Sequence, residues 1–185
     1  MSQDKTPQEK WEAELKQEEH DHHHNPTAAA MTQHILASIH TLHVKLHQYH
    51  WYVKGPHFFV LHSKFEELYN ENEKWFDELA EKLLAAGEKP VSTTEQFLKY
   101  TFLSEDGADK YLTVDKMVDK LVEDYRRVRD LTLRSITMAQ EEDNFVLEDT
   151  LIAYKEFIDK TIWMLQAFLG KEALENDDAF EDDDE

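Results

Sequence analysis

Hydrophobic residues recur at spacings of three and four along four long segments of the chain, which is the pattern of amphipathic α-helices. The predicted helices cover about residues 27–53, 57–86, 114–141 and 145–169. Gly87 and Pro90 follow the second segment and Gly170 follows the fourth, and both residue types favour the ends of helices. The chain is therefore predicted to be all-α, with a core formed by four long helices.

Residues 88–114 connect the second predicted helix to the third. We expect a short helix within this connection, from Thr94 to about Leu103. A connection of this length in a helical bundle indicates a crossover rather than a tight hairpin. Four long helices with one crossover predict a ferritin-like four-helix bundle over residues 27–170.

Residues 1–26 are predicted to be an N-terminal extension that contains a short extra helix. An N-cap, a first-position proline and an acid three residues after the cap form a helix-start signal at Thr6, Pro7 and Glu9. This helix is expected to run to about residue 20, with Trp11 and Leu15 on one side. At the other end, residues 171–185 carry nine acids against a single lysine, which predicts a solvated, disordered tail.

The chain has a formal net charge of −20 and contains no cysteine. This much negative charge repels nucleic acids and membrane surfaces and attracts cations. The lack of cysteine excludes disulfides, thiolate metal sites and cysteine catalysis. The sequence shows no secretory signal and no stretch apolar enough to span a bilayer, so we expect a cytoplasmic protein with no membrane partner.

Two pairs of potential metal ligands lie on the second predicted helix. His62 and Glu66 are four residues apart, and so are Asp77 and Glu81. Residues at this spacing lie on adjacent helical turns and can present two ligands to one ion. Imidazole with carboxylate is a donor set that suits iron, manganese or zinc. For either pair alone, a solvated helix face is the simpler explanation.

The separation of the two pairs predicts an assembly of subunits. His62 and Asp77 are 15 residues apart, or ~22 Å along the helix axis, yet they return to within about 60° of one azimuth. One subunit cannot bring both pairs to one ion, whereas two copies of this helix packed antiparallel about a two-fold axis can. Histidine occurs only between residues 20 and 62, so the third and fourth helices offer no imidazole to a site inside one bundle.

Two further groups of histidines are present. The first shares one face of the first long helix and consists of His40, His43, His47 and His50. For His40 and His43 we favour a polar seam at a subunit interface over metal binding. The second group, near the end of the N-terminal helix, consists of His20, Asp21, His22, His23 and His24. Its donors suit Zn²⁺ or another divalent ion, and the alternative is an exposed tract that binds metal only adventitiously.

Three segments resemble the Dps family of mini-ferritins, the DNA-binding proteins from starved cells. Residues 50–62, HWYVKGPHFFVLH, resemble the family's motif around its first two histidine ligands, and residues 77–87, DELAEKLLAAG, resemble its second motif. The end of the fourth helix, from Trp163 to Gly170, is similar as well. The resemblance implies a hollow shell of twelve subunits that oxidises Fe(II), preferentially with hydrogen peroxide, between two-fold-related subunits. It also implies storage of ferric mineral and protection of the cell from oxidative damage.

By this resemblance, four ligand positions of the ferroxidase centre are occupied by His50, His62, Asp77 and Glu81. The fifth position differs, because the family usually has aspartate where this chain has Glu66. Glutamate keeps the charge and donor atoms but adds a methylene, which could change its reach, shift the second iron or crowd the site. A DNA-binding or protective shell with an impaired ferroxidase site is therefore the alternative function.

The resemblance also assigns residues outside the ligand set. Trp51 corresponds to a residue thought to quench radicals in relatives, and interface packing explains it equally well. Asp149 matches an acidic position of the family's three-fold pore, and Asp143 and Glu148 lie close to it in the sequence. Two other acidic pore positions of close relatives are occupied here by Gln140 and Phe145. We therefore expect a less charged pore constriction.

Some members of this family hold DNA with lysine- and arginine-rich tails, because phosphate neutralisation supplies most of the non-specific affinity. Residues 1–26 carry three lysines against seven acids, and the C-terminal tail is more acidic still. We expect no DNA binding unless a divalent cation bridges the two, and association with the nucleoid only if DNA is bound.

Overall fold

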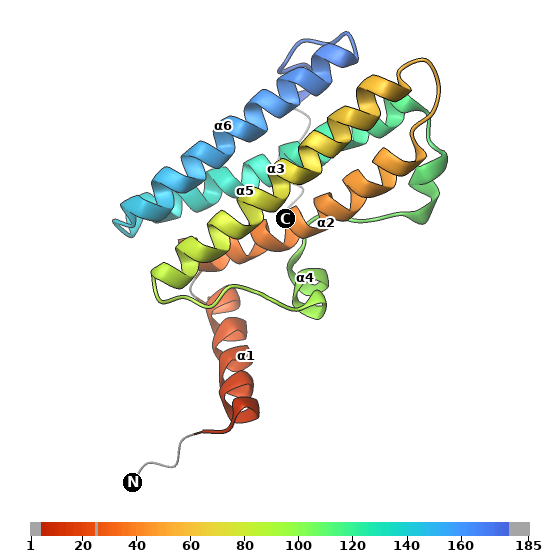
Figure 1. Ribbon diagram of the computed structural model, residues 1–185. Helices are drawn as coiled ribbons and strands as arrows, with labels where there is room; N and C mark the ends of the chain where they lie inside the picture. The colour runs from red at the N-terminus through yellow and green to blue at the C-terminus, as the bar shows by residue number, and fades with distance from the viewer. Residues whose placement is uncertain (1–4, 25, 178–185) are drawn as a thin grey trace.

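The computed structural model describes residues 5–24 and 26–177, except for the side chains of residues 18–24. In chain order its helices are α1 (Pro7–His24), α2 (Ala28–Tyr52), α3 (Phe58–Ala85), α4 (Thr94–Tyr100), the 3₁₀-helix η1 (Gly107–Tyr111), α5 (Val114–Glu141) and α6 (Phe145–Phe168) (Figure 1). The described part of the chain contains no strand. The all-α prediction is confirmed, and the four long helices end within one residue of their expected bounds.

Helices α2, α3, α5 and α6 form the four-helix bundle (Figure 1). Helix α2 packs against both α3 and α5, and α5 packs against α6. The largest fully buried side chains of the core include Tyr49, Phe65, Tyr125 and Tyr154. Each long helix buries one stripe, because residues three and four apart lie on the same face. None of the helices in the described residues is long and apolar enough to cross a membrane.

A buried ion pair joins α2 to α5. The Lys45 Nζ atom lies 2.5 Å from Asp124 Oδ2, and the two side chains are only 6% and 9% exposed. Burial raises the pKa of Asp124, and the charge of Lys45 acts in the opposite direction. Because both side chains are almost fully buried, loss of either partner would leave the other charge unpaired in the bundle interior.

The connection between α3 and α5 runs alongside α2. The side-chain amide of Gln33 donates to the Lys89 carbonyl oxygen (2.9 Å) and accepts from the Val91 backbone N–H (2.8 Å). A side chain of α2 thereby satisfies backbone groups in a stretch that has no helical hydrogen bonds of its own.

Two features of this connection differ from the prediction. Helix α4 ends at Tyr100 rather than near Leu103, because the next residue adopts extended backbone angles (φ −68°, ψ 139°). The 3₁₀-helix η1 was not predicted at all. It is held by the buried carboxylate of Asp109, which accepts hydrogen bonds from the Tyr49 hydroxyl (3.1 Å) and the Lys120 ammonium (2.7 Å). Both partners come from other helices, so local sequence gives no sign of them.

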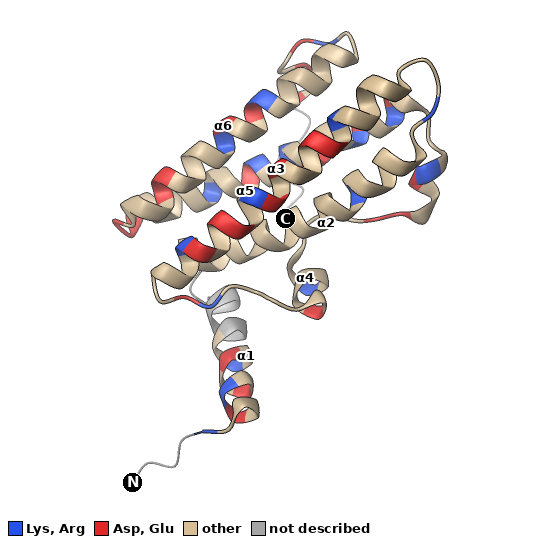
Figure 2. Ribbon diagram, in the orientation of Figure 1, with Lys and Arg blue, Asp and Glu red and all other residues tan. Residues whose placement is uncertain are grey.

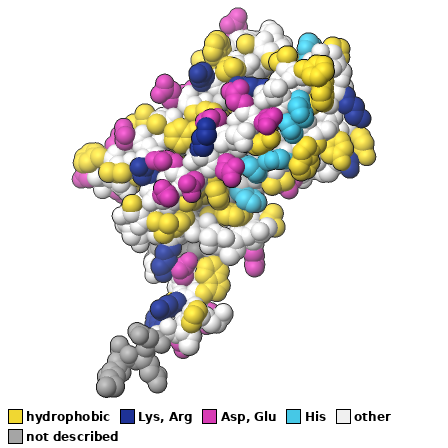
Figure 3. Space-filling view, in the orientation of Figure 1, with side chains coloured by type: hydrophobic (Ala, Val, Ile, Leu, Met, Phe, Trp, Pro, Cys, Tyr) yellow, Lys and Arg dark blue, Asp and Glu magenta, His cyan; other side chains and the backbone are white. Residues whose placement is uncertain are grey.

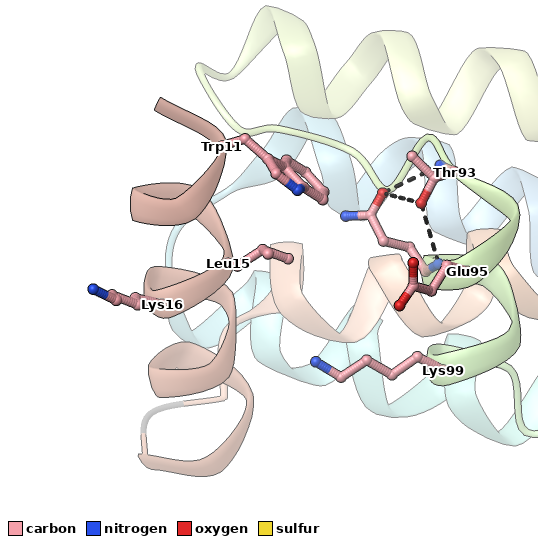
Figure 4. A pocket seen from close by; sticks show the side chains of 7 residues that line it. Trp11, Leu15, Lys16, Thr93, Glu95 and Lys99 are labelled. Carbon is pink, nitrogen blue, oxygen red and sulfur yellow. Dashed lines mark hydrogen bonds between the residues drawn. The ribbon is translucent and has the colours of Figure 1, made fainter. Parts of the chain in front are cut away.

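Helix α1 projects from the bundle (Figure 1). It extends to His24 instead of ending near residue 20, since the acids and histidines after that residue include no helix-breaking glycine or proline. Trp11 and Leu15 face the start of α4, as Figure 4 shows, and border a shallow pocket there together with Thr93, Gln96 and Lys99. The apolar side expected for this helix thus lies against the crossover.

The segment after α6 folds back onto α5. Gly170 has a φ of 72°, a left-handed conformation that reverses the chain direction at the end of the helix. The Arg129 guanidinium then donates two hydrogen bonds to the Asp177 carboxylate (2.9 and 2.8 Å), and Gln166 donates to the Glu175 carbonyl oxygen (2.9 Å). Residues 171–177 therefore make specific contacts where we expected disorder. Residues 178–185 lie outside the described residues.

Candidate metal centre

His50 and His62 stack on each other where α2 ends and α3 begins. Their ring centroids are 3.7 Å apart and the ring planes differ by 18°. The Nδ1 atom of His50 donates to the His62 carbonyl oxygen (2.7 Å), and Nδ1 of His62 donates to the His50 carbonyl oxygen (2.8 Å). A carbonyl oxygen can only accept, so each Nδ1 carries a proton. In each neutral ring the Nε2 lone pair is left for a metal ion.

The short connection from α2 to α3 brings these two histidines together. His50 lies in the last turn of α2, and His62 lies near the start of α3. Between the helices Gly55 has a φ of 102°, which glycine adopts without steric cost, and the chain reverses there. His50 is buried and His62 is half-buried. The reciprocal hydrogen bonds hold both rings in the orientation that metal-bound histidines need.

Glu66 lies one turn beyond His62 on α3 and is exposed. The neighbouring Tyr69 meets the His50 ring edge-on, with centroids 5.5 Å apart. Partial burial, and then the charge of Glu66, raise the pKa of the Tyr69 hydroxyl. Glu66 and Tyr69 are three residues apart and thus lie on the same side of α3. Sequence patterns did not single out Tyr69, because a tyrosine on a helix carries no metal-ligand signal of its own.

Asp77 and Glu81 are exposed on the later part of α3, and Figure 2 shows acidic residues at intervals along this helix. Both carboxylates lie 15 or more residues beyond His62 along this helix. Within the described residues of one chain, no three histidine, aspartate or glutamate side chains come together in a way that could hold a metal ion. One chain therefore presents imidazoles and carboxylates at separate places, and the five-residue site stays a prediction about two subunits.

Trp51 is 67% exposed and meets the His47 ring edge-on, with centroids 5.4 Å apart. It therefore flanks the histidine face of α2. The N-terminal group formed by His20, Asp21, His22, His23 and His24 lies on α1, but its side chains lie outside the described residues. Its binding of zinc or another divalent ion stays a prediction.

The residues expected at a pore surround the turn between α5 and α6. Asp143 has a φ of 55° in this turn, a left-handed backbone conformation at the point where the chain reverses. Glu148 accepts a hydrogen bond from the Gln140 side chain (2.7 Å), and Asp149 is exposed. Asp143 and Asp149 are both exposed, and the pore role of all three acids remains a prediction.

Comparison with known proteins identifies the family of this chain. The family model described as Ferritin-like domain matches residues 29–174. The DNA protection during starvation protein of Listeria innocua is 42% identical over 142 residues, which cover 77% of this chain and 91% of that protein. This chain belongs to the Dps family of ferritin-like proteins.

Other members of the Dps family are also similar to this chain in sequence and in fold. DNA protection during starvation protein 2 of Bacillus anthracis is 39% identical over 130 residues, or 70% of this chain and 88% of that protein. The X-ray structure of Dps from Listeria monocytogenes superposes with a TM-score of 0.79 at 39% identity, covering 82% of this chain and 98% of that one. The Lactococcus lactis DpsB structure gives a TM-score of 0.85 at 31% identity, covering 91% and 96%. The Dps fold predicted from the sequence is confirmed.

Proposed function

We propose that this protein is an iron-oxidising and iron-storing mini-ferritin. Fe(II) is the substrate and binds between two-fold-related subunits. His50, His62 and Glu66 come from one chain, and Asp77 and Glu81 come from the other. The observation that carries this proposal is the His50–His62 pair, whose Nδ1 protons are engaged and whose Nε2 atoms are available.

The donor set fits ferrous iron. Neutral imidazoles supply borderline nitrogen donors, and the carboxylates offset the positive charge of the ion and of its oxidised product. Two Fe(II) ions side by side can each give one electron to hydrogen peroxide. With two protons this yields two Fe(III) ions and two water molecules, and no hydroxyl radical is released. Glu66 is the proposed ligand of the second iron, and Trp51 is proposed to quench stray radicals.

The proposed assembly is a hollow shell of twelve identical subunits that holds the ferric product. It is supported by large apolar side chains that one chain leaves exposed, such as Phe59 at 83% and Trp51 at 67%. Covering such side chains in an assembly removes apolar surface from water, which favours association of subunits. The Listeria and Bacillus relatives named DNA protection during starvation proteins suggest that the shell protects the cell from oxidative damage.

A test is stopped-flow oxidation of Fe(II) by hydrogen peroxide in the wild type and in Asp77→Ala plus Glu81→Ala. We expect the rate to fall by about a hundredfold, equivalent to about 2.7 kcal/mol of barrier. Glu78→Ala is the matched control, because Glu78 is an exposed carboxylate of the same helix that pairs with Lys82 (2.9 Å) and has no proposed ligand role. Equal rates in the double variant and the wild type would reject the proposed centre.

A DNA-binding or protective shell with an impaired iron site is the second candidate. It is favoured by Glu66, which stands where the family usually has aspartate, and by the names of the relatives. The acidic N-terminal extension argues against DNA binding without a bridging metal ion. Fast oxidation by the wild type in the stopped-flow experiment would exclude this candidate.

A further inference from the structure

Helix α2 carries a second pair of histidines ahead of the pair described above. His43 and His47 are four residues apart, and their ring centroids lie 4.5 Å from each other. The Nδ1 atom of His47 donates to the His43 carbonyl oxygen (3.0 Å), so the Nε2 atom of His47 is left with a lone pair. Figure 3 shows histidine side chains gathered on one face of the molecule with acidic side chains beside them. The ferroxidase centre proposed above does not use this pair.

Tyr69 separates the second pair from the first. Its ring stacks on His47 with centroids 3.9 Å apart and also meets His43 edge-on at 5.9 Å. On its other side it contacts His50. The rings of His43 and His47 are therefore held in place by packing, and the pair lies on the turns of α2 that precede the His50–His62 stack. A preordered pair of imidazoles loses little freedom when it binds an ion.

The surroundings of His43 suit a cation. Burial, followed by the charge of His47, lowers the pKa of His43, whereas a hydrogen bond to the Tyr69 backbone and then the charge of Glu73 act in the opposite direction. His43 and Glu73 also border a pocket of about 200 Å³ between α2 and α3, together with Asn72. The Nδ2 atom of Asn72 is fully buried and has no hydrogen-bond partner among the residues that the structure describes. A buried donor of this kind calls for a bound water molecule.

We propose that His43 and His47 form a separate binding site for a divalent cation of the iron, cobalt or zinc type. The two imidazoles are the direct ligands, since no third histidine or carboxylate of the described chain converges on them. Water completes the coordination shell, and the Glu73 carboxylate accepts hydrogen bonds from this water at the edge of the pocket. Each subunit carries this site on its own, so it does not depend on the ferroxidase centre proposed above.

The probe is Co²⁺, titrated calorimetrically into the assembled protein. His43→Gln plus His47→Gln is compared with wild type, and the same pair of substitutions is also made in the Asp77→Ala plus Glu81→Ala background. We expect both comparisons to show the loss of one cobalt ion per subunit. The matched control is His40→Gln, on the same helix, whose half-buried ring borders the same pocket but stacks on Phe97 at 4.4 Å and is not part of the pair.

Several results would overturn the site. These are an unchanged cobalt stoichiometry, an equal loss in His40→Gln, or a loss confined to the protein with Asp77 and Glu81 intact. The last result would mean that the pair belongs to the ferroxidase centre. A cobalt-soaked crystal of the unsubstituted protein gives a check that does not depend on the folding of any variant. An anomalous peak between His43 and His47 supports the site, and its absence refutes it.

Discussion

Removing one partner of the buried ion pair between α2 and α5 tests how much these charges contribute to the stability of the fold. Lys45→Met keeps the length and apolar stem of the side chain but removes its charge. Asp124 would then stay in the bundle interior, where its side chain is 9% exposed, without the ammonium that lies 2.5 Å from it in the wild type. The carboxyl group must remain charged there or take up a proton.

The cost of protonation sets the expected loss of stability. Neutralising Asp124 costs about 1.36 kcal/mol for each pH unit above an unfolded pKa of about 3.9. This is about 4 kcal/mol at pH 7 and about 1.5 kcal/mol at pH 5, and the first value agrees with the roughly 3–5 kcal/mol seen when buried pairs are broken. In the variant the folded pKa lies above the unfolded one. The penalty is therefore small at low pH and grows as pH rises toward the folded pKa.

Urea unfolding followed by circular dichroism at pH 5 and pH 7 measures this difference. Protein concentration must be held constant, because assembly adds to the apparent stability. Lys45→Met plus Asp124→Asn closes the cycle, and we expect it to remove most of the pH dependence of the loss. A loss below about 1 kcal/mol at pH 7, or an equal loss at the two pH values, would refute the reasoning.

Two other predictions concern histidine and the end of the chain. Burial lowers the pKa of His34, so the stability that it contributes is present above about pH 6.5 and is lost as pH falls below that value. His34→Gln should therefore lose less melting temperature than the wild type between pH 7.5 and 5.5, and equal losses would contradict this. Arg129→Ala removes both hydrogen bonds to Asp177 and should speed amide exchange in residues 171–177 by about tenfold, for a net loss of about 1.4 kcal/mol. Lys160→Ala, at an exposed position of α6, is the control, and equal exchange in the two variants would argue against the contact.

The helices could be predicted because their signals are local. Thr27 caps α2 by accepting from the Ala30 backbone N–H, and glycines end α3 and α6. The 3₁₀-helix η1 could not be predicted, because Asp109 is held by Tyr49 and Lys120 from other helices. Composition likewise suggested disorder for residues 171–177, and an arginine 48 positions earlier than Asp177 in the chain overrides that local preference.

The candidate site was predictable in its ligand types but not in its internal geometry. The spacing of His62, Glu66, Asp77 and Glu81 along one helix indicated the donors and their separation. The stacking of His50 on His62 depends on how the chain reverses at Gly55, which no periodicity reports. The sequence also placed His43 and His47 on one helix face, but only the packing of Tyr69 shows that their rings are held together.

The reciprocal hydrogen bonds between His50 and His62 have a consequence for when chemistry can begin. They close within a single chain, so the nitrogen half of the proposed centre is ready before any metal or second subunit arrives. The carboxylate half, Asp77 and Glu81, is exposed on the same chain and in the proposal serves a partner subunit. In the proposed arrangement a newly made single subunit therefore oxidises no iron until it has paired with a second subunit. Subunits would associate first, and iron and peroxide would react at the centre only afterwards.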